Sequence, residues 1–201
     1  MDIFILVMLI AIGVHFLKAK DQRRRIGLLG SHLGQYQIEK LMETLTEGYL
    51  RALGEEDPLR REQIWNLLSS TEVALSDQFG RFAAAFANVA EPQARISKLP
   101  MALPFADQLF PVATFDVRKA FRIHAQGISQ AAQNNTHQPI KTKAFILLAE
   151  VFLMQHTCHW FCKSKTIASA RVLFRHKTSY EQVLAAVAPD TRRAYLALTA
   201  T

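Results

Sequence analysis

The chain opens with an unbroken apolar run, and apolar residues then recur at helical spacing along most of the remaining sequence. Residues 3–17 read IFILVMLIAIGVHFL, in which His15 is the one polar side chain. This run is near the lower limit for crossing a bilayer, because a helical span takes about 20 residues. A cleaved signal peptide would need a basic start and a small-x-small cleavage site, which this segment lacks. The pattern therefore favours a signal anchor over a cleaved signal or a buried helix.

The charges that flank this run predict its orientation. Only Asp2 precedes it, whereas five basic residues follow it closely: Lys18, Lys20, Arg23, Arg24 and Arg25. Basic flanks stay on the cytoplasmic side of a membrane. We therefore expect residues 1–25 to form a transmembrane helix and basic stem with the N-terminus outside. Residues 26–201 would form a cytoplasmic domain, with a bacterial inner membrane as the expected location.

The domain itself has the composition of an all-α fold, with few glycines and prolines and long stretches rich in Ala, Leu, Gln, Glu and Arg. Residues 31–90 hold two amphipathic segments, separated by Gly54 as a helix stop and by Asp57-Pro58 as a helix start. Two such segments joined by a short turn predict an antiparallel helical hairpin. A hinge or a closely packed glycine face is expected before it, at Gly27, Gly30 and Gly34.

Residues 91–111 contain four of the seven prolines and cannot form a continuous helix. Their many apolar side chains predict a loop packed against the helices, where it could line a ligand or peptide groove. Residues 112–201 then predict a helix from Thr114, a central helix from Pro139 to about Lys163, and shorter C-terminal helices.

The central helix is apolar on all sides, which is typical of a buried helix or of a second membrane span. A span would cover residues 144–162, and the polar residues Glu150, Gln155, His156 and His159 inside it favour the buried helix.

The same helix carries the strongest candidate for chemistry. Cys158 and Cys162 are one turn apart, and His159 is three residues before Cys162. Together with His156 they are candidate ligands for zinc or another transition metal, and a bis-His haem site completed by His124 is conceivable. Free cysteines are usually buried core residues, and no second cysteine pair completes a zinc pattern. We therefore expect no cofactor, with zinc or haem as the alternative.

Charge divides the domain into an acidic and a basic half. Residues 39–91 hold five basic and ten acidic side chains, whereas residues 141–201 hold nine and three. An acidic row, typical of a solvated face or of a contact for a basic partner, consists of Glu39, Glu43 and Glu47. The two halves could complement each other within the fold. Alternatively, the basic half could rest on anionic lipid or bind nucleic acid.

The expected anchor would hold the domain beside anionic lipid. We therefore expect the basic half to contact lipid rather than nucleic acid. The residues expected at the membrane surface are therefore those of the stem together with Arg171, Arg175 and Lys177.

No hydrolase, kinase, metalloprotease or phosphate-binding motif is present. We therefore predict a membrane-anchored interaction, scaffold or regulatory protein, whose partners are the lipid bilayer and another protein. One alternative is a metal- or haem-binding sensor or redox component that uses the His/Cys cluster. A second alternative is a membrane-associated enzyme of unidentified chemistry.

Overall fold

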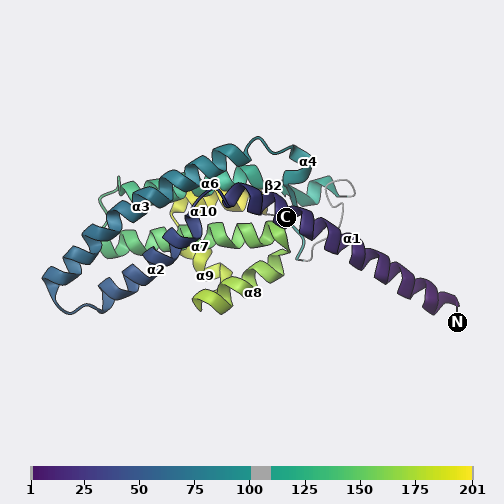
Figure 1. Cartoon of the computed structure of the whole chain (residues 1–201), viewed down its shortest axis with the longest axis horizontal. Coiled ribbons are helices and arrows are strands. Elements are labelled where there is room, and N and C mark those ends of the chain that lie inside the picture. Colours follow the sequence, from purple (N-terminus) through teal and green to yellow (C-terminus); the bar gives the residue numbers. More distant parts are fainter. Residues whose placement is uncertain (1, 101–109, 201) are drawn as a thin grey trace.

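A long N-terminal helix leads into a predominantly helical body (Figure 1), as predicted. The computed structural model describes residues 2–100 and 110–200. Helix α1 (Asp2–Leu33) is continuous over 32 residues; its first half projects from the body and its second half packs on it (Figure 1). The other helices are α2 (Ile38–Gly54), α3 (Pro58–Phe86), α4 (Glu91–Ala94), α6 (Val117–Gln133), α7 (Ile140–Cys162), α8 (Lys165–His176), α9 (Tyr180–Ala186) and α10 (Pro189–Thr199).

The α2–α3 hairpin extends to the end of the body farthest from the N-terminus (Figure 1). Asp57 starts α3, because its carboxylate accepts a hydrogen bond from the Leu59 backbone N–H at 2.9 Å and Pro58 needs no such partner. The two helices approach closely at Gly48 of α2, where the side chain of Leu68 fills the space that a Cβ would occupy.

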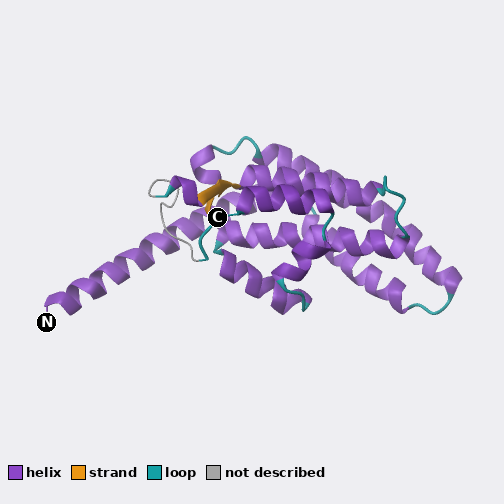
Figure 2. Ribbon diagram, turned by 180° about the vertical axis from the view of Figure 1, so that it is seen from behind, coloured by secondary structure: helices purple, strands orange, loops and turns teal. Residues whose placement is uncertain are grey.

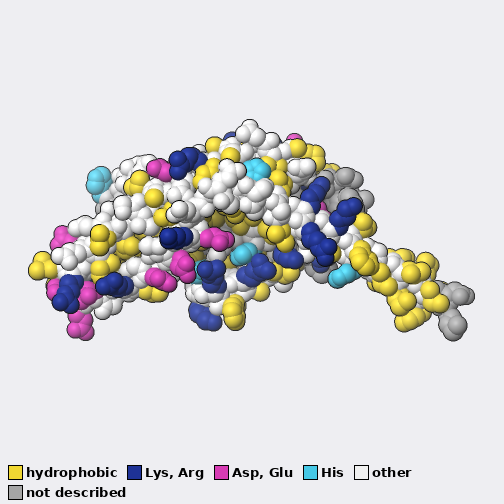
Figure 3. All heavy atoms as spheres, in the orientation of Figure 1, with side chains coloured by type: hydrophobic (Ala, Val, Ile, Leu, Met, Phe, Trp, Pro, Cys, Tyr) yellow, Lys and Arg dark blue, Asp and Glu magenta, His cyan; other side chains and the backbone are white. Residues whose placement is uncertain are grey.

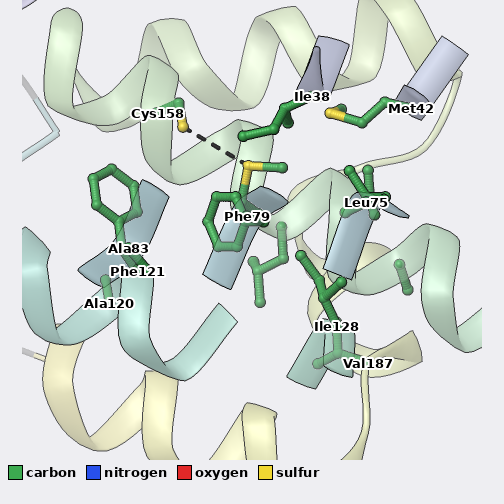
Figure 4. Close-up of a cluster of buried hydrophobic side chains, with 14 of the residues drawn as sticks. Ile38, Met42, Leu75, Phe79, Ala83, Ala120, Phe121, Ile128, Cys158 and Val187 are labelled. Carbon is green, nitrogen blue, oxygen red and sulfur yellow. Dashed lines mark hydrogen bonds between the residues drawn. The ribbon is translucent and has the colours of Figure 1, made fainter. Parts of the chain in front are cut away.

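Helix α7 is the central helix of the body, in contact with α6, α8, α9, α2 and the second half of α1 (Figure 2). Its apolar residues join a core that Figure 4 shows in close-up. Aromatic rings link the layers of this core: Phe121 of α6 lies 5.1 Å from both Phe82 and Phe86 of α3, measured between ring centroids. Phe86 in turn lies 5.9 Å from Phe161 of α7.

Two short strands interrupt the helical pattern. Strand β1 (Arg95–Ser97) pairs antiparallel with β2 (Thr114–Asp116), with Ile96 opposite Phe115. The indole N–H of Trp160 on α7 donates to the carbonyl of Ser97 at 3.0 Å, which fixes the pair to the core. Both strands fall where the sequence predicted a loop or the start of a helix. Residues 101–109, the middle of the predicted packed loop, lie outside the described residues.

The predicted hinge at Gly27 and Gly30 is wrong. Both residues lie inside α1, and a Cβ at either would have no neighbour within 4 Å, so neither allows a close approach. The backbone stays helical through them, and the turns around them are held by the body, since Arg25 and Leu29 are both buried. The chain turns only after Leu33, and the next helix starts at Ile38 rather than near Ser31.

A buried carboxylate connects the hairpin to the central helix. Glu72 of α3 is 4% exposed; its Oε1 accepts from the hydroxyl of Tyr49 on α2 at 2.5 Å, and its Oε2 pairs with the ammonium group of Lys143 on α7. Burial raises the pKa of Tyr49, and Glu72 acts in the same direction. The phenol of Tyr49 therefore remains a hydrogen-bond donor. The carboxylate of Glu72 on α3 thus holds one side chain from α2 and one from α7.

Replacing Glu72 with Ala should lower the free energy of unfolding by about 3 kcal/mol, because it leaves a cation and a phenol without their buried partner. Urea unfolding of the full chain in mild detergent measures the change. The matched control is Glu62→Ala on the exposed face of the same helix, which should cost less than about 0.5 kcal/mol. Equal losses in the two variants would contradict the assignment.

Candidate functional site

The four His and Cys residues singled out on α7 point to different surroundings. His156 is buried against α8 and α9: its ring stacks on Tyr180 at 4.4 Å, and its Nε2 lies 3.1 Å from the Ser169 hydroxyl. Cys158 faces the apolar core, with its Sγ 3.8 Å from the sulfur of Met154 (Figure 4). Across residues 2–100 and 110–200, no three His, Cys, Asp or Glu side chains form a group that could hold a metal ion. Zinc or haem binding stays a prediction, for which the described residues show no assembled ligand set.

Both thiols are in surroundings that keep them protonated. Burial raises the pKa of Cys158 and of Cys162; for Cys162, Arg171 and Arg25 act in the opposite direction. Since the thiolate is the reactive and metal-binding form, neither residue has the environment of a nucleophilic cysteine.

A buried polar chain links three helices across the core. The Nε2 of His124 on α6 lies 2.8 Å from the Thr157 hydroxyl on α7, which lies 2.9 Å from the hydroxyl of Tyr195 on α10. Burial lowers the pKa of His124 to about 3, and the nearby His156 contributes in the same direction. The imidazole is therefore neutral and enclosed, and the chain ties α6, α7 and α10 together.

A second buried polar group holds the start of α10. The Oε1 of Glu150 on α7 accepts from the backbone N–H of Ala188 at 3.0 Å. Gly127 of α6 makes room for it, because a Cβ there would collide with the carboxyl group and with the hydroxyl of Thr191. Burial raises the pKa of Glu150 to about 7, although the nearby Thr191 side chain and the backbone N–H of Ala188 act in the opposite direction.

A groove runs along the side of α7 that the other helices leave open. Its floor includes the half-buried side chains of Phe152 and Gln155, which line the smaller of two hollows. Two adjoining hollows, with volumes of about 200 and 600 Å³, open between α2 and α8, and Glu39, Glu43 and Arg175 line both. None of the four residues of the predicted cluster lines either hollow: His159 and Cys162 are half-buried on α7, and His156 and Cys158 are buried.

The two walls of the groove carry opposite charge. The exposed row of Glu39, Glu43 and Glu47 on α2 lines the smaller hollow together with Arg175 on α8, and Arg171 is exposed one turn before Arg175. On the face shown in Figure 3, acidic side chains over α2 lie beside basic side chains over α8. Among the described residues, no ion pair within 4.0 Å joins this acidic row to α8. Apart from Lys40, which lines the larger hollow on the α2 side, the walls therefore present separate negative and positive surfaces to the solvent.

His176 lines the smaller hollow on the α8 side, and His159 of α7 lies beside Arg171. His176 stacks on Phe152 with ring centroids 3.7 Å apart and contacts the Gln155 amide oxygen at 2.7 Å, while His159 Nδ1 lies 3.2 Å from a nitrogen of Arg171. Burial, assisted by neighbouring arginines, lowers the pKa of both to about 4. They are neutral at physiological pH, so the positive charge of this wall comes from the arginines.

The residues expected at a membrane surface fall into two separate places. Lys20, Arg23 and Arg24 are exposed on the stem and Lys18 is half-buried there, but Arg25 turns inward, where its guanidinium donates to the Arg95 carbonyl at 2.9 Å. Helix α8 starts beside the stem, since Lys163 Nζ donates to Gln22 Oε1 at 2.9 Å, and then leads away from the projecting end of α1 (Figure 1). Arg175 and Lys177 therefore lie toward the far end of α8.

The groove as a unit was not predicted from the sequence. Its signal in α7 was limited to Gln155, which interrupts the all-round apolar pattern. The opposing wall could not be located, because nothing in the sequence places α2 beside α8.

Comparisons with known proteins identify no relative. No protein-family model, curated protein or solved structure matches the chain. Function is therefore inferred from the geometry of the fold and the groove.

Replacing Glu150 with Gln should change how stability depends on pH. The folded-state pKa of about 7 lies above the usual 4.5, so the stabilising contribution of this carboxyl group is complete below the unfolded value and is lost as the pH rises through 7. Gln keeps the acceptor for Ala188 and cannot ionise. The variant should exceed the parent in stability by about 1–3 kcal/mol at about pH 8.5 and differ little at about pH 5.

Urea unfolding of both proteins at the two pH values tests this expectation. The buried histidines are common to parent and variant and cancel in the comparison. Glu181→Gln, at an exposed position on α9, is the control and should leave the pH dependence unchanged. A Glu150→Gln variant that loses as much stability as the parent between the two pH values would show that the carboxyl group is not protonated in the fold.

Proposed function

We propose that the chain is a single-pass membrane protein in which α1 anchors a helical interaction or scaffold domain at the cytoplasmic face. One observation carries this proposal: the large apolar side chains from Ile3 to Leu17 are 43–79% exposed, without any part of the described body packed against them. Contiguous apolar surface of this size is unfavourable in water, at about 25 cal/mol per Å². A bilayer core removes that cost along the whole segment.

The continuity of α1 supports an anchor over a removable leader. The second half of the helix is part of the body, where Arg25 bridges to β1 and lies over the ring of Phe161 at 5.5 Å. Helical backbone runs without interruption from the apolar half into this packed half. The exposed basic residues between the two halves support a cytoplasmic body, through the preference of Lys and Arg for that side.

A second helix, Ile140–Cys162, is also long and apolar enough to cross a membrane. More than half of its most apolar stretch is buried in the body, and its polar residues Thr157 and His156 have partners on α10 and α8. Its placement supports a core helix, which leaves α1 as the proposed span.

The groove supports an interaction role over catalysis. Catalysis needs titratable groups that converge on a site open to substrate. In the described chain, His124 and Glu150 are enclosed, and the histidines beside the groove are turned toward neighbouring side chains. Walls of opposite charge above a partly apolar floor are features of a surface that binds a macromolecule.

Two arginines in α1 test the anchor. Leu6→Arg with Ile10→Arg should move the protein from the carbonate-resistant membrane fraction to the soluble or aggregated fraction, since each arginine near the centre of a span adds about 2.5–3.5 kcal/mol to the free energy of insertion. The control variant has two apolar-to-arginine substitutions on the exposed face of α3, Leu67→Arg and Val73→Arg. It should stay in the membrane fraction.

Orientation is tested with reporters fused to the C-terminus of the parent chain. A fluorescent protein that folds only in the cytoplasm should be active, and a phosphatase that needs export should be inactive. An active phosphatase would overturn the cytoplasmic placement. Extraction of the parent chain by carbonate would overturn the anchor itself.

A further inference from the structure

The charged groove between α2 and α8 is self-complementary. The acidic row on α2 consists of Glu39, Glu43 and Glu47, and the basic row on α8 consists of Arg171 and Arg175. Both rows repeat at four-residue intervals, so along each helix the side chains project on one side. Two copies that face each other through this groove can therefore place each negative row opposite a positive one.

We propose that this groove is the contact between two copies of the chain, related by a two-fold axis that runs along the groove. Rotation about such an axis exchanges the walls, so that α2 of each copy lies over α8 of the other. In this arrangement every contact occurs twice, as in most symmetric dimers. The dimer rests on the proposed interaction function and makes it more specific, because it identifies a second copy of the chain as the partner that binds in the groove.

The register of the charges fits this symmetry. Arg175 lines the same two hollows as Glu39 and Glu43, so it lies at their level along the groove. A two-fold axis along the groove keeps that level unchanged while it exchanges the sides. Arg175 of each copy then meets Glu39 and Glu43 of its partner without any shift of one copy along the other.

The direction of α1 agrees with this axis. Helix α1 leaves the body at one end of its long dimension, and the α2–α3 hairpin forms the other end (Figure 1). A two-fold axis close to this long dimension keeps both projecting helices at the same end, so both can enter one bilayer. A contact with its axis across the long dimension would send them in opposite directions.

The floor of the groove is better suited to contact with a protein surface than to binding a small ion. Phe152 is half-buried and stacked against His176, and Gln155 is held by the same imidazole. These groups offer apolar area and few open polar atoms. Two chains confined to a membrane also meet at a high effective concentration, so a contact of modest area suffices for association.

Charge exchange between two variants tests the proposal on the full chain. In a dimer of Glu43→Arg, the substituted side chain on α2 of each copy meets Arg175 of the other copy, so both partners are positive. In a dimer of Arg175→Glu, the substituted side chain on α8 meets Glu43 of the other copy, so both partners are negative. Each variant alone should self-associate at least about tenfold less than the parent, because two repulsive contacts replace two attractive ones in every dimer. A mixture of the two variants should recover the association of the parent, since each altered residue then meets its opposite.

Energy transfer between donor- and acceptor-labelled chains in lipid nanodiscs large enough for two copies measures the association. The control pair, Glu62→Arg and Lys141→Glu, carries the same changes at exposed positions on α3 and α7 outside the groove, and should associate like the parent. Recovery in the mixture also shows that both groove variants fold.

Two results would overturn the proposal. If each groove variant associates like the parent, the groove is not the contact. If both lose association and the mixture stays apart, the charges act within one chain or on a different partner. Carbonate extraction of the same proteins reports on the anchor separately, so its failure and the failure of the dimer are distinguishable.

Discussion

The fold depends on the enclosure of α7, an apolar helix that must be covered on almost every side. Helices α6, α8 and α9 supply most of the cover, and the second half of α1 completes it at the C-terminal end of α7. Covering a helix this way forces its few polar groups to find partners inside the body. The hydrogen bonds of Thr157, His156 and Glu150 to α10, α8 and the residue before α10 meet part of that requirement, although His156 Nδ1 and Glu150 Oε2 have no hydrogen-bond partner among the described residues. They also fix which neighbour lies on which side.

The open stripe of α7 results from the same constraint. Helix α2 touches α7 over only part of its length, and α8 lies across from it, so a strip of half-buried residues remains between them. The side of the central helix that the described chain leaves open is thus bordered by rows of opposite charge.

Local signals in the sequence predicted most of the helices but few of the contacts between them. Asp57-Pro58 and Pro139 mark the starts of α3 and α7, because proline and a capping carboxylate act within one turn. Strands β1 and β2 escaped prediction, since three-residue strands are too short to show a period and depend on pairing across the chain. The inward turn of Arg25 was equally hidden: its partners, the Arg95 carbonyl and Phe161, are distant in sequence. His156 and Cys158 of the candidate metal cluster point to different surroundings for a geometric reason, because residues two apart on a helix face different sides.

The unbroken course of α1 has a mechanical consequence for a chain anchored through it. One helix of 32 residues belongs to the proposed span and to the packed body at once, with no flexible joint between them. Any tilt of the span therefore becomes the same tilt of the body, and any rotation about the helix axis turns the charged groove with it. Bilayer thickness sets the tilt of a short span. If α1 spans a bilayer as proposed, the body would behave as a lever whose angle to the membrane plane is set by the lipid around the first half of α1.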